Sequence, residues 1–486
     1  MSGDGRFFLF LAIPQRSAEI VCLKVGQYAI ILPMTTERKE NKMGVMPVKQ
    51  LIISMSLPMM ISMLVQALYN VVDSIFVAQI SEHALTAVSM AFPLQNLMIA
   101  VSTGPAVGVN ALLSRNLGAK NYEKVNHIAN HAVFLALMSY LIFVVIGYFG
   151  AEPFFRSQTD IEEIVVYGIQ YTRICLCASV GFFVQMFFER ILQATGKSVA
   201  SMVTQMMGAI INIILDPILI FGMFGLPAMG VRGAAIATVT GQIVAGIVGV
   251  IINQKKNKEV KIQLKGFRPD FALIKQIYGI GIPSIIMASI GSVMNYGMNR
   301  ILLGFTSTAT AVFGVYFKLQ SFVFMPVFGL NNGMIPVISY NYGAGNRERV
   351  MKAIKTSAVM AVGIMMMGLL VFQTIPTTLL HMFDASETML EIGVPALRTI
   401  SLSFIFAGFG IACSGTFQAL GKAFFSMLMS IARQLLVLLP AAYLLSLSGK
   451  VRLVWWAFPI SEIMAITVCI CFLFHINKTL ISKIGK

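Results

Sequence analysis

The chain has 486 residues, of which 57% are hydrophobic and 12% are charged, and its mean hydropathy is +0.81. Soluble domains carry about 25% charged residues, so this composition excludes an ordinary water-soluble protein and indicates a membrane protein. The net charge of +16 would suggest a nucleic-acid partner only if the location of the charges were ignored, and we expect no such partner.

The first 48 residues differ from the rest of the chain. The apolar run FFLFLAI at 7–13 is too short to cross a bilayer, and no cleavage-site pattern follows it. We interpret residues 1–48 as an N-terminal extension and assign it no function. A start at Met34 or Met43, which would make the extension an artefact of start-site assignment, explains the pattern equally well.

Long apolar stretches dominate the remainder of the chain. A membrane-spanning helix needs roughly 20 mostly apolar residues. Twelve stretches meet this requirement: 51–78, 85–113, 128–149, 164–192, 199–222, 232–253, 272–303, 309–337, 351–374, 392–419, 424–447 and 453–476. The sequence therefore predicts an all-α integral membrane protein with twelve transmembrane helices.

The charges between these stretches predict the orientation, because loops on the cytoplasmic side carry an excess of lysine and arginine. With the N-terminus placed inside, the inner loops and the tail hold most of the cations: Arg115, Lys120, Lys124, Lys197, Lys255, Lys256, Lys258, Lys261, Lys265, Arg268, Arg347, Arg349, Lys352, Lys422, Lys478, Lys483 and Lys486. The longer outer loops are acidic, with Glu152, Asp160, Glu162, Glu163, Asp384 and Glu387. The short outer loop with Lys450 and Arg452 runs against the pattern. We expect a plasma-membrane or inner-membrane protein with both termini in the cytoplasm.

The chain contains two copies of one six-helix unit. A shift of 225 residues places SRNLGAKNYEKV (114–125) on SYNYGAGNRERV (339–350), with seven of twelve positions identical. The same shift places ILQATGK (191–197) on TFQALGK (416–422). Because an even number of helices returns the chain to the same side, the two lobes are related by a pseudo-twofold axis along the membrane normal. We expect an N-lobe at 49–254, a basic cytoplasmic linker at 255–270, a C-lobe at 271–480 and a tail at 481–486.

The duplicated S-x-N-x-G-A-x-N motif, the LP pair at 57–58, the segment VDSIFVA and the QATGK and QALGK turns together resemble one family. It is the multidrug and toxic compound extrusion (MATE) family of cation-coupled antiporters, in its bacterial DinF-like and MepA-like branch. The resemblance covers about 48–480. It implies export of organic, often cationic, compounds, driven by inward H⁺ or Na⁺.

Acidic residues at membrane depth are functional candidates, because placing a charge there costs a few kcal/mol. Asp73 lies in the first stretch and Asp216 in the fifth, with Asn212 one helical turn before it on the same face. Carboxylate and amide oxygens suit a hard cation such as Na⁺, or a proton relay. Thr238 in the sixth stretch adds a hydroxyl beside a surface of small residues. The resemblance places the family's cation site on these four residues; a buried polar tie between helices is the alternative.

The repeat makes this constellation specific to one lobe. The counterparts of Asp73, Asn212 and Asp216 are Met298, Val437 and Ala441, and the stretches 272–303 and 392–419 contain no acid. We therefore expect the N-lobe to bind the coupling cation.

Other polar residues at membrane depth are weaker candidates for a substrate cavity or a gate. Lys318 is either a cation in the cavity or the partner of a carbonyl or an acid, and Glu189 beside Arg190 is either a gate or a pair at the membrane surface. Glu462 either faces the cavity or ties helices together. The set is Asn70, Gln95, Glu189, Asn295, Lys318 and Glu462.

Together these observations predict an antiporter for small organic molecules, monomeric within the lipid bilayer, with no cofactor other than the coupling ion. The rival is a flippase for lipid-linked sugars of the same superfamily, which the basic C-lobe residues keep open. An enzyme is not expected, since no H-E-x-x-H or Walker motif is present and the five histidines show no metal spacing.

Overall fold

The computed structural model describes residues 19–25, 28–34, 40–263, 265–383 and 385–485. The apolar run at 7–13, Asp384 and Lys486 therefore lie outside the described residues. The chain divides into two compact units, Met1–Asn41 and Lys42–Lys486. In the first unit, β1 (Glu19–Val25) and β2 (Tyr28–Met34) form an antiparallel hairpin in which Glu19 pairs with Met34.

The first half of the membrane unit runs from α1 to α9. Its long helices follow the predicted stretches closely: α2 (Val48–Ala78), α3 (Glu82–Gly118), α4 (Tyr122–Val145), α6 (Glu162–Cys177), α7 (Val180–Ala194), α8 (Ser198–Phe221) and α9 (Val231–Lys256). Short elements complete it: α1 (Lys42–Val45), the π-helical turn η1 (Ile146–Gly150), α5 (Ala151–Arg156) and the 3₁₀ turn η2 (Met223–Gly225).

The second half repeats this order. Its main helices are α10 (Phe271–Leu303), α11 (Ser307–Gly343), α12 (Arg347–Thr374), α14 (Glu387–Ser401), α15 (Phe404–Ala419), α16 (Ala423–Ile431), α17 (Leu439–Ser446) and α19 (Ala457–Thr479). The short elements are α13 (Pro376–His381), the π-helical segment η3 (Ala432–Leu438), α18 (Val451–Val454) and η4 (Ile481–Lys483).

The helices account for twelve membrane crossings. Among the described residues, ten helical segments are long and apolar enough to span a bilayer. Two further spans are broken: α6 and α7 meet at 45°, and α14 and α15 meet at 47°. Counting each bent pair as one span gives twelve, six in each half, so the predicted fold class is confirmed.

The repeat reappears in how the helices begin. Ser81 accepts the backbone N–H of Ala84 at the start of α3, and its repeat counterpart Thr306 accepts that of Ala309 at the start of α11. A side-chain oxygen at this position satisfies a backbone donor that the helix itself leaves unpaired. Asn121 and Asn346, the last residues of the two S-x-N-x-G-A-x-N motifs, cap α4 and α12 in the same way.

The duplicated motifs also bind to each other within each half. Ser114 donates to the carbonyl of Ala194 in the QATGK turn at 3.1 Å, and Ser339 donates to the carbonyl of Ala419 in the QALGK turn at 2.8 Å. Both bonds are buried, where a net stabilisation of about 1 kcal/mol each is typical. The two sequence motifs therefore form one structural joint, built twice.

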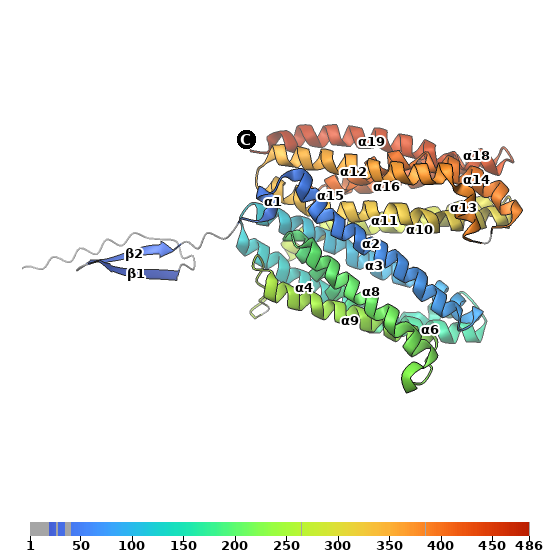
Figure 1. Cartoon of the computed structure of the whole chain (residues 1–486), viewed down its shortest axis with the longest axis horizontal. Helices are drawn as coiled ribbons and strands as arrows, with labels where there is room; N and C mark the ends of the chain where they lie inside the picture. Colours follow the sequence, from blue (N-terminus) through green and yellow to red (C-terminus); the bar gives the residue numbers. More distant parts are fainter. Residues whose placement is uncertain (1–18, 26–27, 35–39, 264, 384, 486) are drawn as a thin grey trace, which may run out of the picture. The chain divides into compact units, whose positions relative to one another are not determined.

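The two halves contact each other at one end of the membrane unit. Gly118 at the end of α3 packs against the backbone of Tyr340, and its counterpart Gly343 at the end of α11 packs against the backbone of Arg115. Ser56 of α2 donates to the carbonyl of Leu330 in α11 at 3.3 Å. Figure 1 shows α1 and the end of the chain at this same end, with the blue-to-green and yellow-to-red helices spreading apart away from it.

Candidate functional site

A buried polar cluster joins α8 and α9 in the first half. Asp216 and Asn212 lie one turn apart on α8 and are 0% and 3% exposed, and Thr238 on α9 faces them at 9% exposure. In the amide orientation that satisfies both neighbours, the Asn212 nitrogen donates to Asp216 Oδ2 at 3.2 Å. The Asn212 oxygen then accepts from Thr238 Oγ1, also at 3.2 Å. The Asn212 amide therefore links the Asp216 carboxylate on α8 to the Thr238 hydroxyl on α9.

Asp73 completes the cluster from α2. Its carboxyl group lies within hydrogen-bonding reach of Asp216, while its own Oδ1 is buried and lacks a hydrogen-bond partner. A hydrogen bond between two carboxyl groups requires a proton on one of them, and two carboxylates this close repel each other unless a cation lies between them. The structure therefore brings all four predicted residues together, and it leaves one acidic oxygen free to bind.

Aromatic and polar side chains surround the two acids. Tyr69 on α2 and Tyr171 on α6 are close enough to interact electrostatically with Asp73. Gln95 on α3 donates to the Tyr171 hydroxyl at 3.2 Å, and Cys175, one turn along α6, hydrogen-bonds to the same tyrosine.

Gln95 was a candidate from the sequence, whereas the two tyrosines and the cysteine were not. Each belongs to an apolar helical face on which a tyrosine or a cysteine reads as ordinary packing, so no sequence signal could have found them.

Asn70 and Asn295, the polar repeat counterparts beside the acid position, do not join this cluster. The Asn70 side chain is exposed on α2, and its backbone carbonyl accepts the Ser74 hydroxyl at 2.8 Å. Asn295 is half-buried on α10. Their proposed place in a substrate cavity stays a prediction.

Glu189 and Arg190 lie near the end of α7 and are each 5% exposed, so they are not a pair at the membrane surface. Neighbouring residues on a helix point about 100° apart, and each has its own partners. Glu189 accepts from Gln185 at 2.9 Å, while Arg190 donates to Gln193 at 3.0 Å and to Asn332 at 2.9 Å. Since Asn332 lies on α11, Arg190 connects the two halves at the end where they meet.

The second half carries a charge pair of its own, at positions that do not correspond to Asp73 or Asp216 in the repeat. Arg433, in the π-helical segment η3, donates to Glu462 on α19 at 2.7 Å. The side chains are 23% and 11% exposed, and Arg433 Nε and Glu462 Oε2 are buried and lack a partner. The sequence allowed Glu462 either to face the cavity or to connect helices, and the structure shows an ion pair that connects η3 to α19.

Two further cations, Lys318 and Arg173, make contacts of their own. Lys318 Nζ lies 5.9 Å from the centre of the Phe383 ring. Among the described residues it has neither the carbonyl nor the acid partner that was considered from the sequence. Arg173 forms an ion pair with Glu152 at 3.4 Å, and its repeat counterpart Arg398 accepts a hydrogen bond from Gln373 on its backbone carbonyl. Within the described residues, no group of three His, Cys, Asp or Glu side chains is placed to hold a metal ion.

Comparison with known proteins gives consistent relatives. A family model described as MatE matches residues 58–218 and 283–444, one match in each half. The multidrug export protein MepA of Staphylococcus haemolyticus (strain JCSC1435) is 29% identical over 418 residues, covering 85% of this chain and 90% of that protein. MepA of Staphylococcus aureus (strain MRSA252) is 27% identical over 418 residues, covering 84% and 90%.

Solved structures share the fold along nearly the whole chain. One, described as the outward-facing conformation of a multidrug resistance MATE family transporter of the MOP superfamily, has a TM-score of 0.85 at 26% identity, covering 91% of this chain and 98% of that one. A MOP superfamily transporter from Pyrococcus furiosus Vc1 (DSM3638), described as having a binding pocket of reverse polarity that suggests a different function, has a TM-score of 0.84 at 26% identity, covering 92% and 98%.

Proposed function

This chain belongs to the multidrug and toxic compound extrusion (MATE) family of membrane transporters, and from that premise we propose that it exports organic, cationic compounds in exchange for H⁺ or Na⁺. It is a multi-pass multidrug efflux transporter of the bacterial plasma membrane and not an enzyme. The coupling ion, the charge of the substrate and the alternating-access cycle are the parts that we propose.

The observation that carries the coupling role is the pair of facing carboxyl groups on Asp73 and Asp216. A proton on either carboxyl, or a Na⁺ between them, relieves their mutual repulsion. The oxygens of Asp73, Asp216 and Asn212 are the hard ligands that a cation such as Na⁺ prefers. The described residues of the second half offer no equivalent pair of acids, and Arg433 neutralises the buried Glu462 there.

Helix α2 links this site to the contact between the halves. Asp73 lies in its outer part, whereas Ser56 and Met60 in its other part pack against α11. Pro58 lies within this contact, between Ser56 and Met60, where its missing N–H and its ring weaken the helix. A change of charge at Asp73 that alters the bend at Pro58 would therefore change the contact between the halves. The cation and the substrate would then both shift the same equilibrium, between halves in contact and halves apart. Coupling between two ligands requires such a shared equilibrium.

Gradient-driven efflux of a fluorescent organic cation from cells or everted vesicles tests the proposal. Asp73→Asn and Asp216→Asn should each reduce efflux to background, while the exposed loop variant Asp160→Asn should retain it. Imposing pH and Na⁺ gradients separately identifies the coupling ion. Intact efflux in both membrane variants would falsify the coupling role.

The flippase alternative makes a different prediction in the same vesicles. A flippase would move a fluorescent lipid-linked sugar between leaflets and would be indifferent to Asp73→Asn. The ring contact of Lys318 and the ion pair of Arg433 leave these two cations less available for an anionic headgroup than the sequence suggested. We therefore favour drug export.

A further inference from the structure

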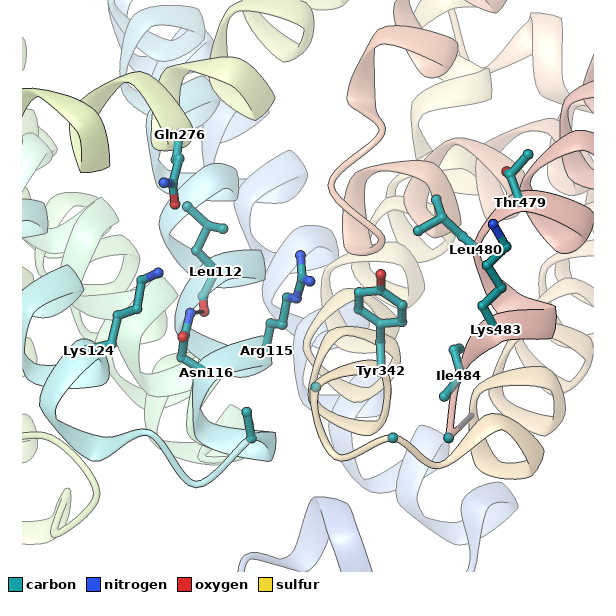
Figure 2. Close-up of a pocket in the computed structure, with 14 residues that line it drawn as sticks. Leu112, Arg115, Asn116, Lys124, Gln276, Tyr342, Thr479, Leu480, Lys483 and Ile484 are labelled. Carbon is teal, nitrogen blue, oxygen red and sulfur yellow. Dashed lines mark hydrogen bonds between the residues drawn. The ribbon is translucent and has the colours of Figure 1, made fainter.

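A basic cavity lies at the end of the membrane unit where the two halves meet. Its volume is about 630 Å³, within the roughly 300–1,000 Å³ range of small-molecule sites. Its walls come from the ends of α3 and α11, the start of α4, one residue of α10, and the end of the chain beyond α19. Figure 2 shows Arg115 and Tyr342 side by side in the middle, with Lys124 on one side and Lys483 on the other.

The cavity carries three positive charges and no acidic side chain among its lining residues. Arg115, Lys124 and Lys483 supply the charges, and within the described part of the chain the ion pairs involve other residues. The Arg115 guanidinium carbon lies 4.6 Å from the centre of the Tyr342 ring, a cation–π contact that holds the group in place. An arginine fixed in this way is suited to bind phosphate oxygens with two donors at once.

The internal repeat shows that the corresponding place in the other copy is filled by the chain itself. There Arg349, the counterpart of Lys124, donates to the carbonyls of Met43 and Met46 at 3.0 and 2.7 Å. Asn341, the counterpart of Asn116 in the cavity wall, also donates to the Met43 carbonyl, at 3.1 Å. The segment α1 thus satisfies the cation of one copy with backbone oxygens.

Among the residues that the structure describes, the first copy has no such internal partner. The segment 267–271 corresponds in the repeat to 42–46, which is α1 and the residue after it. This segment packs instead onto α4, where the Phe267 ring contacts His131 and Phe134. Lys124 and Asn116 therefore face a cavity rather than a piece of the chain. A ligand bound in this cavity would supply anionic oxygens to Lys124 and Asn116, where the α1 carbonyls supply oxygens in the other copy.

The position of the cavity indicates where that occupant comes from. The helices α3, α11 and α19 end around it, so it lies at the level where a bilayer presents its headgroups. Apolar side chains lie beside the cations on both sides of the cavity, Leu112 on one side and Leu480 and Ile484 on the other (Figure 2). Basic pockets between membrane helices on the cytoplasmic side bind anionic lipid headgroups, and the loop charges predict that this is the cytoplasmic side.

We propose that this cavity binds the phosphate-bearing headgroup of an anionic phospholipid, and that the bound lipid stabilises the state in which the two halves are closed at this end. Arg115 and Lys124 belong to the first half, whereas Tyr342 and Lys483 belong to the second. One phosphate between them connects both halves, so it binds this closed state more tightly than a state in which the halves separate. Anionic lipid would thereby set the balance of the transport cycle, whatever the exported compound is.

The test uses the full chain in nanodiscs that contain phosphatidylglycerol and phosphatidylcholine. Retention of phosphatidylglycerol is measured by native mass spectrometry for the wild type and for the triple variant Arg115→Gln, Lys124→Gln, Lys483→Gln. A matched control removes three exposed cations outside the cavity: Lys255→Gln, Lys256→Gln, Lys258→Gln. At about fivefold per cation near a membrane surface, the cavity variant should bind the lipid roughly 100-fold more weakly, and the control should bind as the wild type does.

Closure is followed in vesicles by the rate at which a maleimide labels Ser56→Cys, which is buried between the halves, in a background without the native cysteines. Labelling should be slower with phosphatidylglycerol than with phosphatidylcholine alone, and this difference should vanish in the cavity variant. Lys483→Gln alone, in the exposed turn η4, should weaken lipid retention about fivefold without disturbing the fold.

Two results would overturn the proposal. Equal loss of lipid in the cavity variant and the control would mean general attraction to a basic surface. If millimolar glycerol phosphate slows labelling in phosphatidylcholine vesicles as much as phosphatidylglycerol does, the site takes a free phosphate compound and not a lipid.

Discussion

Replacing Gly118 or Gly343 with alanine should weaken the contact between the two halves. A Cβ at Gly118 would lie 2.8 Å from the Tyr340 carbonyl carbon, and one at Gly343 would lie 2.7 Å from that of Arg115. Ordinary contact begins at 3.4 Å, so the two backbones must separate by more than half an ångström. Overpacking of this kind costs about 1–3 kcal/mol. It should move the equilibrium away from closure at this end by roughly 5- to 150-fold.

The Ser56→Cys labelling assay measures this shift, and each alanine variant should be labelled faster by a factor within that range. Gly314→Ala is the matched control, because it lies on the same helix as Gly343 and an added Cβ there meets no atom within 4 Å. Labelling of the two variants at the control rate would show that the glycine contact does not hold this end closed, and the reasoning from backbone packing would be wrong.

Three further changes test other contacts. Arg433→Gln or Glu462→Gln leaves one buried charge without its partner, and each should lower the apparent unfolding temperature by the equivalent of about 3 kcal/mol. The double variant should recover most of this loss. A double variant whose loss equals the sum of the two single losses would contradict the prediction. Arg190→Gln removes the donor to Asn332 on the opposite half and should speed Ser56→Cys labelling several-fold, an outcome that unchanged labelling would rule out. Thr238→Val removes the hydroxyl that orients the Asn212 amide beside Asp216. Losing this hydrogen bond should raise the cation concentration needed for half-maximal efflux by about tenfold. An unchanged cation dependence would assign Thr238 to packing alone.

The four acids at membrane depth show how far the sequence led and where it stopped. The i, i+4 spacing of Asn212 and Asp216 predicted a shared helical face, and the structure places Asp73 and Thr238 against that face. That these residues bind the coupling cation stays a prediction. The sequence left Glu189 and Glu462 with two roles each, because the partners that decide between them lie on other helices.

The bends within the fourth and tenth spans are a second feature that could not be predicted from the sequence. The stretch 164–192 reads as one continuous apolar helix, yet α6 and α7 meet at 45°. Ser179, at the break, donates its hydroxyl to the carbonyl of Leu176 at 2.7 Å, and Ser403 does the same to Ile400 at 2.6 Å in the second half. Such local bonds compete with the regular helix, and the residues at the two breaks, 178–179 and 402–403, include neither glycine nor proline.

The sequence by itself determined the twelve spans, the two-lobed repeat and which lobe carries the pair Asp73 and Asp216. These follow from one-dimensional requirements: the thickness of a bilayer, the energy of placing a charge in it, and the even number of helices in each copy. Only the tertiary structure decided that Gly118 and Gly343 pack the halves together, that Arg433 neutralises Glu462, and that α1 fills one copy of a site whose twin is a basic cavity. Each of these depends on which helix lies beside which. That is settled by the packing of side chains far apart in the chain, and no local pattern records it.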